Sequence, residues 1–297
     1  MKINKIHNID AIDGLKCLAD DSADCIILDP PYNIGKDFGN NKTKQDIRQY
    51  VSWSKQWIEQ SKRVLKPSGT MFIYGFSEIL AHLSVNLDME HRWLVWHYTN
   101  KTVPSLNFWQ RSHESVLCAW HDKSQRIFNR DAVREPYTDK FIQGYKDKGR
   151  KRPQTKGRFS SDKEETVYKV NDKGALPRDV LKHSTLAGGS GRKERVFYCR
   201  KHGQAYHPKE MKNHKNCKTA DGQSAILKHP TQKPIELTNR LISSCMPEKG
   251  LVVVPFVGSG SEIHVSKKLG HDYVGFEINE DYFKLINFFI NNDLEAK

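Results

Sequence analysis

The sequence predicts an α/β fold in which helices cover both faces of a largely parallel sheet, interrupted by one long insertion. Strand-length apolar runs alternate with helix-length segments in the first 130 residues and again after residue 228, which is typical of a doubly wound sheet. Between about residues 134 and 228 this alternation fades, and Gly, Lys, Arg and Ser dominate. We therefore predict a core of residues 1–135 and 229–297, with residues 136–228 inserted.

Length and charge narrow the class of partner. The 297 residues suffice for one large domain with a sizeable core. Lys and Arg outnumber Asp and Glu by 48 to 35, which gives a formal net charge of +13. This charge favours a polyanionic partner, because each phosphate that is neutralised releases condensed counterions. Charge alone does not separate DNA from RNA.

Cysteine usage and hydropathy indicate a reduced, cytoplasmic protein without membrane contact. The six cysteines are scattered, and the first residues lack the apolar core of a signal peptide. The longest apolar run, near residues 251–257, has the length of a strand, whereas a membrane-spanning helix needs roughly 18 apolar residues. We therefore expect no membrane span.

Hydrophobic periodicity places the elements of the core. In the first half we expect helices at residues 12–18 and 47–65 and strands at 3–6, 25–28, 70–74, 93–97 and 115–120. Lys66-Pro67-Ser68-Gly69 predicts a turn before the third of these strands. In the second half we expect helices at 235–245 and 261–269 and strands at 251–254 and 273–276.

The buried run at residues 25–28 ends at Asp29-Pro30-Pro31. Two prolines cannot donate hydrogen bonds into a central strand, so the strand must end there, with Asp29 at its carboxyl edge. Ligands bind at this edge in open parallel sheets. The sequence thus predicts that Asp29 faces a ligand.

Asp29-Pro30-Pro31-Tyr32 has the groups needed to activate an exocyclic amino group of a base. The lone pair of such a nitrogen is delocalised into the ring, which makes it a poor nucleophile. The Asp29 carboxylate can accept one N–H and the Pro30 carbonyl the other, holding the nitrogen in line with a methyl donor. Tyr32 offers a flat face for a base rotated out of a duplex.

A glycine-containing loop follows the strand at 251–254 and opens a helix, which suits close approach of a ligand to a helix N-terminus. Its residues are Pro255, Phe256, Val257, Gly258, Ser259, Gly260 and Ser261. Glu277 ends the next predicted strand, where an acidic side chain can bind both hydroxyls of a ribose. The spacing therefore predicts a nucleoside-containing cofactor.

Together, the DPPY tetrapeptide and the F-x-G-x-G loop resemble the signature of DNA amino-methyltransferases. The order of tetrapeptide, basic region and loop is similar to the β group of that family. The resemblance implies a Rossmann-like S-adenosylmethionine-dependent methyltransferase fold, with a mostly parallel seven-stranded sheet and an inserted target-recognition region. It also implies adenine N6 methylation of double-stranded DNA by base flipping and direct attack, since Asp in the first position leans towards adenine.

Family resemblance also assigns residues and partners. Segments 63–70, 113–114 and 229–234 are similar to family segments. The resemblance implies a catalytic set of Asp29, Pro30, Pro31 and Tyr32, and a donor-binding set of Asp10, Asp29, Lys233, Pro255, Phe256, Gly258, Ser259, Gly260, Ser261 and Glu277. In it, Lys233 lines the methionine side of the donor and Asp10 lies beside its adenine. A homodimer and a cognate restriction endonuclease are further partners that it suggests.

Two positions depart from the family pattern. Val254 stands where Asp is common before the Pro-Phe pair, so a polar contact near the methionine amino group must come from elsewhere, with Asp10 and Lys233 as candidates. Ser261 replaces the usual Thr and keeps a hydroxyl that can cap the following helix and touch the donor.

Three other functions stay open. Cytosine N4 is an alternative target, and RNA or a protein glutamine is an alternative substrate, although glutamine enzymes usually carry Asn first and lack a basic insertion. A third alternative is a DNA-binding protein that keeps the fold without catalysis, which Val254 alone favours.

The insertion holds two further patterns. Residues 140–158 carry eight basic side chains against the single acid Asp147, with Tyr145 and Phe159 interleaved, which favours phosphate contact over a merely solvated loop. Cys199-x-x-His202 and His214-x-x-Cys217 have spacings that can close a tetrahedral zinc site. A solvated loop with two free thiols is the alternative. No metal is expected in catalysis, because methyl transfer needs no Lewis acid.

Overall fold

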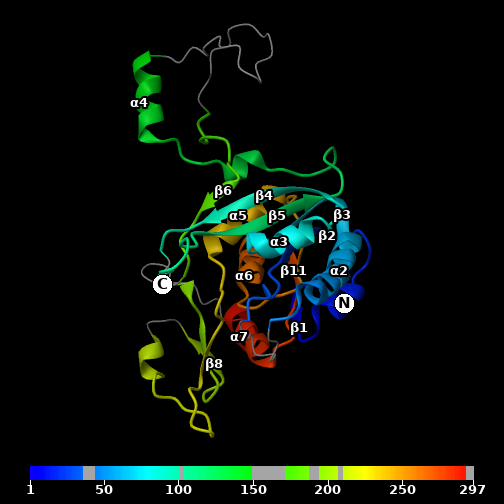
Figure 1. Cartoon of the computed structure of the whole chain (residues 1–297), viewed down its shortest axis with the longest axis vertical. Coiled ribbons are helices and arrows are strands. Elements are labelled where there is room, and N and C mark those ends of the chain that lie inside the picture. The colour runs from blue at the N-terminus through cyan, green and yellow to red at the C-terminus, as the bar shows by residue number, and fades with distance from the viewer. Residues whose placement is uncertain (36–43, 101–103, 149–170, 187–193, 207–209, 292–297) are drawn as a thin grey trace. The chain divides into compact units, whose positions relative to one another are not determined.

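The computed structural model describes residues 1–35, 44–100, 104–148, 171–186, 194–206 and 210–291 (Figure 1). The chain divides into two compact units, residues 1–128 with 179–297, and residues 129–178. The first unit is an α/β domain and carries the predicted motifs. Among the described residues, no helix combines the length and apolar character that crossing a membrane requires.

An eight-stranded sheet forms the centre of the first unit, in the order β1-β11-β10-β2-β3-β5-β4-β6. The strands are β1 (Lys5–His7), β2 (Ala23–Leu28), β3 (Leu65–Gly75), β4 (Glu90–His97), β5 (His113–Trp120), β6 (Val180–Lys182), β10 (Leu251–Val254) and β11 (Asp272–Phe276). Neighbouring strands pair in parallel except around β5, which is antiparallel to β3 and β4. The largely parallel sheet predicted from the sequence is confirmed.

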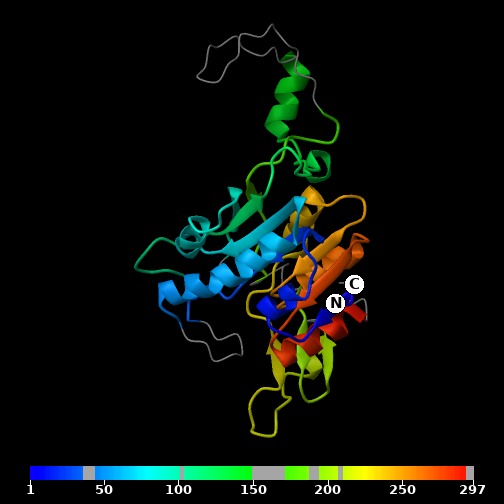
Figure 2. The ribbon, with the colours of Figure 1, turned by 90° about the vertical axis from the view of Figure 1, so that its right-hand side faces the viewer.

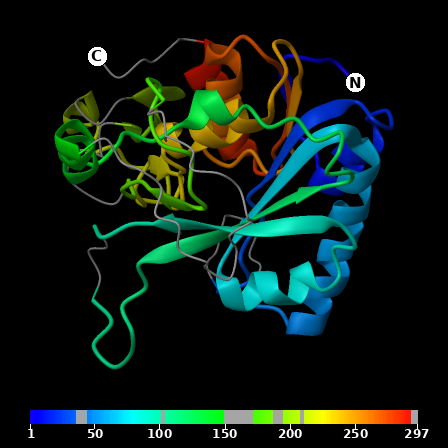
Figure 3. The same ribbon diagram turned by 90° about the horizontal axis from the view of Figure 1, so that it is seen from above.

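Helices cover both faces of this sheet because successive side chains of the central strands are buried on opposite sides. Leu28 of β2 packs with α1 (Ala11–Lys16), α2 (Ile47–Val64) and α3 (Ser77–Ser84). Ile27 packs with α5 (Ile235–Cys245), α6 (Ser261–Lys268) and α7 (Glu280–Asn291). Figure 3 shows α2 and α3 (blue and cyan) on one side of the strands and the orange and red helices on the other.

The turn predicted at residues 66–69 is a bulge inside a longer strand. Ala23 and Cys25 of β2 pair with Leu65 and Thr70 of β3, so two positions on one strand face five on the other. Pro67 lies in this bulge, where its missing N–H costs no ladder hydrogen bond. The strand therefore begins at Leu65, five residues before the predicted start.

The sheet has eight strands where seven were predicted, and the additional strand, β6, comes from the region predicted as an insertion. β6 pairs in parallel with β4 and satisfies backbone groups that an edge strand would leave open. The smaller compact unit covers residues 129–178, while residues 179–228 group with the core. The predicted boundaries at 136 and 228 thus differ from this division, because short strands of three residues carry no readable periodicity.

A second sheet of three short strands belongs to the same unit. It has the order β8-β7-β9, formed by β7 (Phe197–Cys199), β8 (Gln204–Tyr206) and β9 (Ile226–Lys228). β8 contacts α7 of the large domain, and Figure 2 shows the yellow-green strands beside the red helix. In the sequence, the last strand of this sheet ends directly before His229, the first residue of the predicted segment 229–234.

The described residues of the second unit, 129–148 and 171–178, form few regular elements. They are η1 (Arg130–Val133), α4 (Asp139–Lys148) and an isolated bridge between Glu135 and Ala175. Of the basic segment 140–158, residues 149–158 lie outside the described residues, as does Phe159. The predicted phosphate contact stays a prediction.

Candidate active site

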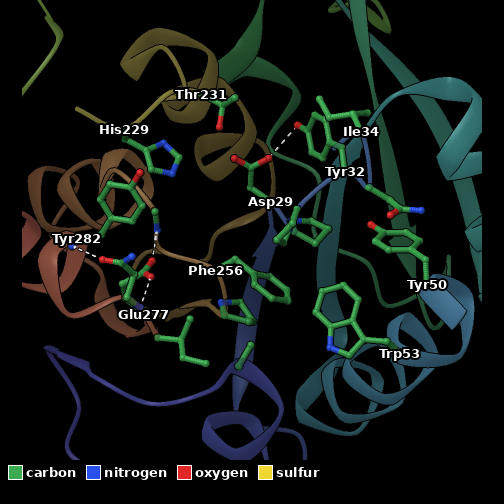
Figure 4. Close-up of a pocket in the computed structure, with 18 of the residues that line it drawn as sticks. Asp29, Tyr32, Ile34, Tyr50, Trp53, His229, Thr231, Phe256, Glu277 and Tyr282 are labelled. Carbon is green, nitrogen blue, oxygen red and sulfur yellow. Dashed lines mark hydrogen bonds between the residues drawn. The ribbon is translucent and has the colours of Figure 1, made fainter. Parts of the chain in front are cut away.

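One cavity of about 230 Å³ lies at the carboxyl ends of the neighbouring strands β11, β10 and β2. Asp29 follows β2, Pro255 follows β10 and Glu277 follows β11, and all three line the cavity. Figure 4 shows Asp29 and Tyr32 on one side of it, Glu277 with His229 and Tyr282 on the other, and Phe256 between them. The two motifs predicted from the sequence thus share one pocket.

The Asp29 carboxylate is part of a buried polar cluster. Its Oδ2 accepts a hydrogen bond from Lys233 Nζ at 2.8 Å, and its Oδ1 accepts one from Tyr32 Oη at 2.8 Å. Tyr32 Oη also lies 3.0 Å from Glu114 Oε2, and Lys233 Nζ lies 3.8 Å from the same oxygen. The Lys233 side chain is only 2% exposed, so this ammonium is the counter-ion for both carboxylates.

Charge and burial oppose each other in this cluster. Burial lowers the pKa of Lys233, but Asp29 and Glu114 outweigh it and hold the pKa above its ordinary value. Burial raises the pKa of Glu114 despite the nearby ammonium. Burial and the two carboxylates also raise the pKa of Tyr32 well above its usual range. Lys233 therefore stays charged and Tyr32 stays a hydrogen-bond donor at neutral pH.

The glycine loop is tightly constrained. Gly258 has φ +56, and a Cβ built on it would lie 2.9 Å from His229 Nε2. Gly260 has φ +87, and its Cβ would lie 2.8 Å from Ile286. Both the left-handed backbone and the close neighbours exclude larger side chains. Phe256 packs edge-on against Trp53 and Trp57, with ring centroids 5.9 and 5.8 Å apart.

The Glu277 carboxylate is held by backbone groups. Its Oε2 accepts a hydrogen bond from Gly258 N and its Oε1 accepts one from Asn279 N, both at 2.8 Å. Burial raises the pKa of Glu277 to about 7. Each oxygen keeps a second lone pair, so the carboxylate can still accept hydrogen bonds from a ligand in the cavity.

Most predicted site residues line the cavity, and four do not. Lining residues from the predicted sets are Asp10, Asp29, Pro30, Pro31, Tyr32, Pro255, Phe256, Gly258 and Glu277. Those that do not line it are Lys233, Ser259, Gly260 and Ser261. Lys233 reaches the pocket through Asp29 instead, and its predicted contact with a donor stays a prediction.

The prediction that Ser261 caps the helix is wrong. Gly260 is the N-cap of α6, and no side chain caps this helix end. Ser261 Oγ is buried and donates to the backbone oxygen of Lys233 at 2.9 Å. Its hydroxyl therefore ties the loop to the segment that carries the buried ammonium.

Asp10 and Val254 show how the missing family acid is accommodated. Val254 is 1% exposed and packs into the core, so no acid takes its place there. Asp10 lines the cavity while its Oδ1 accepts from Ile12 N at 2.8 Å, which caps α1. Of the two predicted substitutes, Asp10 is the one that faces the cavity.

Several pocket residues were missed by sequence reasoning. Five of them are Tyr50, Trp53, His229, Asn279 and Tyr282. Tyr50 and Trp53 lie on α2, where helical spacing alone does not distinguish a pocket face from a core face. His229 packs edge-on against Tyr282, with ring centroids 4.9 Å apart. The segment 229–234 was the available signal for His229.

Glu262 is a further buried acid that the sequence did not single out. It lies in the first turn of α6, is 3% exposed, and does not line the cavity. Burial, followed by the charge of Asp29, raises its pKa to about 7. Its Oε1 has no hydrogen-bond partner among the described residues.

Comparison with known proteins agrees with this geometry. The profile of a family described as DNA methylase, named for N6 and N4 methyltransferases, matches residues 23–288. The chain belongs to this family of DNA methylases. The match spans the Asp29-Pro30-Pro31-Tyr32 tetrapeptide, the glycine loop and the segment between them.

Two relatives cover most of the methylase chain. It is 28% identical over 280 residues to the type II methyltransferase M.HpaI of Haemophilus parainfluenzae, across 93% of this chain and 70% of that protein. It is 26% identical over 286 residues to the DNA adenine methyltransferase YhdJ of Escherichia coli (strain K12), across 94% and 80% of the two chains.

Solved structures share the fold. M1.HpyAVI, crystallised as a complex with SAM, superimposes with a TM-score of 0.52 at 19% identity, over 95% of this chain and 98% of that one. The PvuII DNA methyltransferase, described as cytosine-N4-specific, superimposes with a TM-score of 0.59 at 14% identity, over 100% and 89%. The predicted Rossmann-like methyltransferase fold is thereby confirmed.

Proposed function

We propose that this DNA methylase transfers a methyl group from S-adenosylmethionine to adenine N6 at specific sites in double-stranded DNA. One observation carries the proposal: the tetrapeptide that begins at Asp29 lines the same cavity as Gly258 and Glu277. A base held at the first and a nucleoside donor held at the second would meet inside it. The cavity, its acid and its glycine loop fit the chemistry that the family name describes.

The glycine loop and Glu277 fit the nucleoside part of the donor. Gly258 leaves open the space that a Cβ would fill against His229, and Glu277 presents a carboxylate with free lone pairs. Asp10, Phe256 and Asn279 complete this side of the cavity. When bound, S-adenosylmethionine supplies a methyl group on a positively charged sulfur, which an amino nitrogen can attack directly.

Asp29 and Pro30 would orient the target amino group. The Asp29 carboxylate accepts one N–H and the Pro30 carbonyl the other, so the nitrogen moves towards tetrahedral geometry and its lone pair is less delocalised into the ring. Lys233 fixes Asp29 Oδ2, and Tyr32 fixes Oδ1, so the carboxylate is positioned before substrate arrives. After transfer, the amino group must lose a proton, and the Asp29 carboxylate that accepts its N–H would be an acceptor for it.

Base flipping is required because base pairing and stacking in a duplex block access to the lone pair of the amino nitrogen. Tyr32 and Phe76 line the cavity beside Asp29, with ring centroids 5.2 Å apart in an edge-on arrangement. Aromatic walls of this kind hold extrahelical bases by stacking. The insertion at residues 136–228 would read the target sequence, and its basic segment would contact phosphates.

Adenine is favoured over cytosine by two observations. Asp29 holds the first position of the tetrapeptide, and the relative YhdJ is named a DNA adenine methyltransferase. Cytosine N4 is the second candidate, since a cytosine-N4 enzyme shares this fold with a TM-score of 0.59. Both targets use the same activation of an exocyclic amino group.

The deciding experiment is transfer of labelled methyl from S-adenosylmethionine to unmethylated genomic DNA, followed by nucleoside analysis. We expect N6-methyladenine. N4-methylcytosine would keep the mechanism and overturn the base assignment. If the protein binds DNA and neither product appears, the non-catalytic alternative replaces the proposal.

A cognate restriction endonuclease and a second copy of this chain are two further partners that we propose. M.HpaI is named a type II methyltransferase, and we propose a cognate restriction endonuclease that is blocked by the same methylation. Cleavage of unmethylated but not methylated DNA by that endonuclease would test this. The homodimer expected from family resemblance is tested by light scattering at micromolar protein.

A further inference from the structure

We propose that Cys199, His202, His214 and Cys217 bind one structural Zn²⁺ ion. Each residue offers one ligand atom, and the four atoms all lie within 4.8 Å of one another. They belong to the segment of residues 197–228, which we call the Cys/His module. Its site lies apart from the methyl-transfer pocket and uses none of the residues that line it.

Four of the six distances between the ligand atoms lie close to the edges of a zinc tetrahedron. Zn–S bonds of roughly 2.3 Å and Zn–N bonds of about 2.05 Å place two nitrogens about 3.3 Å apart and a nitrogen and a sulfur about 3.6 Å apart. His214 Nδ1 lies 3.3 Å from His202 Nδ1. Cys199 Sγ and Cys217 Sγ lie 3.2 and 3.8 Å from His202 Nδ1. Cys217 Sγ lies 3.9 Å from His214 Nδ1.

Local backbone structure presents the ligands in two pairs. The turn between β7 and β8 brings His202 back to Cys199, because His202 N and Gly203 N both donate to Cys199 O, at 3.1 and 2.8 Å. Gly203 has φ +65, which suits such a turn. In the second pair, Cys217 N donates to His214 O at 2.9 Å. The Cys199-x-x-His202 and His214-x-x-Cys217 spacings therefore serve to aim four side chains at one point.

A solvated loop would not bury its thiols in this way. Cys199 is 0% exposed and Cys217 is 9% exposed. The two histidine rings pack edge-on with centroids 4.9 Å apart, and Tyr206 stacks on His214 at 3.8 Å. Two thiols and two imidazole nitrogens then face one another with no apolar group between them, which is a donor set for a metal rather than for a core.

The donor set selects zinc and a structural role. Two sulfurs and two nitrogens in a tetrahedron suit Zn²⁺ in preference to Mg²⁺ or Ca²⁺, which take oxygen ligands. Four protein ligands fill the coordination sphere, so no position remains for a water or substrate. The ion would hold the module together, because among the described residues the buried cluster around the ligands is small, with Cys199, Cys217 and Ala225 buried and Tyr206 and Ile226 packed against them.

The site also reaches the wall of the methyl-transfer pocket through the backbone. Cys199 pairs with Ile226 of β9, and Ala225 N donates to Cys217 O at 2.9 Å. β9 ends at Lys228, immediately before His229, which lines the pocket. On the other side of the module, Arg200 forms an ion pair of 2.7 Å with Asp281 of α7. Zinc would therefore anchor one wall of that pocket.

Metal content of the full chain tests the proposal directly. The protein is purified without chelator under reducing conditions, and zinc is measured by mass spectrometry. We expect one zinc per chain, and less than a tenth of that in Cys199→Ser and Cys217→Ser. Cys17→Ser is the matched control, since Cys17 is an exposed cysteine outside the module and should leave the stoichiometry at one.

A second measurement covers the case in which the variants fail to fold. Wild-type protein is stripped of metal and titrated with Co²⁺, and the intense visible bands of tetrahedral cobalt with thiolate ligands are expected at one equivalent. Absence of zinc together with absence of these bands would overturn the proposal. So would a Cys199–Cys217 disulfide in the protein as purified, or full zinc content in both cysteine variants.

Discussion

The methyl-transfer pocket and the Cys/His module both place polar side chains at the ends of strands, but they hold them by different means. Asp29 and Glu277 follow β2 and β11, whose side chains are buried on both faces between layers of helices. The strands of the module have three residues each; they bury Tyr198 and Ala205 against the α/β core, and the cluster around the ligands themselves is small.

This difference shows what sets the precision of each site. In the pocket, apolar packing of the sheet fixes the backbone, and a charged network then fixes Asp29 through Lys233 and Tyr32. In the module, the buried cluster around the ligands is small, so we expect the metal bonds to fix the backbone there. We expect the pocket to depend on single side chains and the module to depend on its ion.

The largest expected effect is loss of chemistry in Asp29→Ala. Removing the carboxylate removes the group that orients the amino nitrogen, and we expect methyl transfer to fall roughly 10³-fold. DNA binding should be retained, as a filter-binding assay would show. Asp13→Ala, which removes an exposed acid of α1, is the control and should keep activity. Equal losses in both variants would contradict the assignment of Asp29.

The Asp29 variant also leaves the Lys233 ammonium buried without its main partner, which destabilises folded proteins by roughly 3–5 kcal/mol. Circular dichroism therefore accompanies the assay. The double variant Asp29→Asn with Lys233→Met removes both charges of this pair, and Glu114 can take up a proton because burial already raises its pKa, so we expect the variant to regain stability but not activity. Activity in this double variant would show that the charge pair, not the Asp29 carboxylate, is what the reaction needs.

The next effect concerns the module and tests the comparison itself. Removing zinc with a chelator should increase proteolytic cleavage within residues 197–228 by about 100-fold, because the apo segment lacks a core of its own. Cleavage within the α/β core should change less than about threefold. Mass spectrometry of the fragments gives both rates. Equal acceleration in both regions would mean that the module and core unfold together.

The two acids with a pKa of about 7 offer a smaller, pH-dependent test. Glu277 lines the cavity and Glu262 does not. A ribose hydroxyl donates to a carboxylate, so donor affinity should rise roughly tenfold between pH 6 and 8 as Glu277 ionises. Calorimetry should show that Glu277→Gln loses this dependence and Glu262→Gln keeps it. If Glu262→Gln loses the pH dependence and Glu277→Gln keeps it, the proposed contact between Glu277 and the donor is contradicted.

The free energy of unfolding should fall as the pH rises and these two acids ionise, whereas donor affinity should rise. The folded-state pKa of about 7 lies above the ordinary value of 4.5 for both Glu262 and Glu277. Their contribution to stability is therefore fully present below pH 4.5 and is lost as pH rises through 7. Each Gln variant should flatten this part of the stability profile, measured by urea unfolding.

The smallest effect separates backbone strain from close contact. Gly258 and Gly270 both have positive φ, but a Cβ meets His229 at the first and open space at the second. Gly270→Ala should cost only the strain, about 1 kcal/mol of unfolding free energy. Gly258→Ala should cost more and weaken donor binding roughly tenfold, because His229 must move. Matching donor affinities in the two variants would show that His229 yields freely.

Much of the pocket could be predicted because each element carries its own local signal. Pro30 and Pro31 end a buried strand, which fixes Asp29 at the sheet edge, and a loop of glycines before a helix marks the donor side. Lys233 was harder to interpret, because its partner Asp29 lies 204 positions away and no pattern links them. Tyr50 and Trp53 show the same limit on a helix face.

Other misses came from elements that are too short to show periodicity. β6 completes the sheet with three residues, and β7 to β9 form a sheet of three-residue strands. The four Cys and His ligands were recognised as two pairs by spacing, but their convergence depends on how those short strands pair. Spacing predicts ligands, whereas only three-dimensional structure shows that they meet.

Strand order has a consequence for how the protein is made. β2 lies next to β10 in the sheet, although more than 220 residues separate them in sequence. During synthesis, the catalytic tetrapeptide therefore leaves the ribosome long before the loop and acid that complete its pocket. Contacts of such separation form late in folding. A nascent or truncated chain that stops before Glu277 carries the reactive half of the site and no complete donor pocket, so modification of DNA has to wait for the whole α/β core.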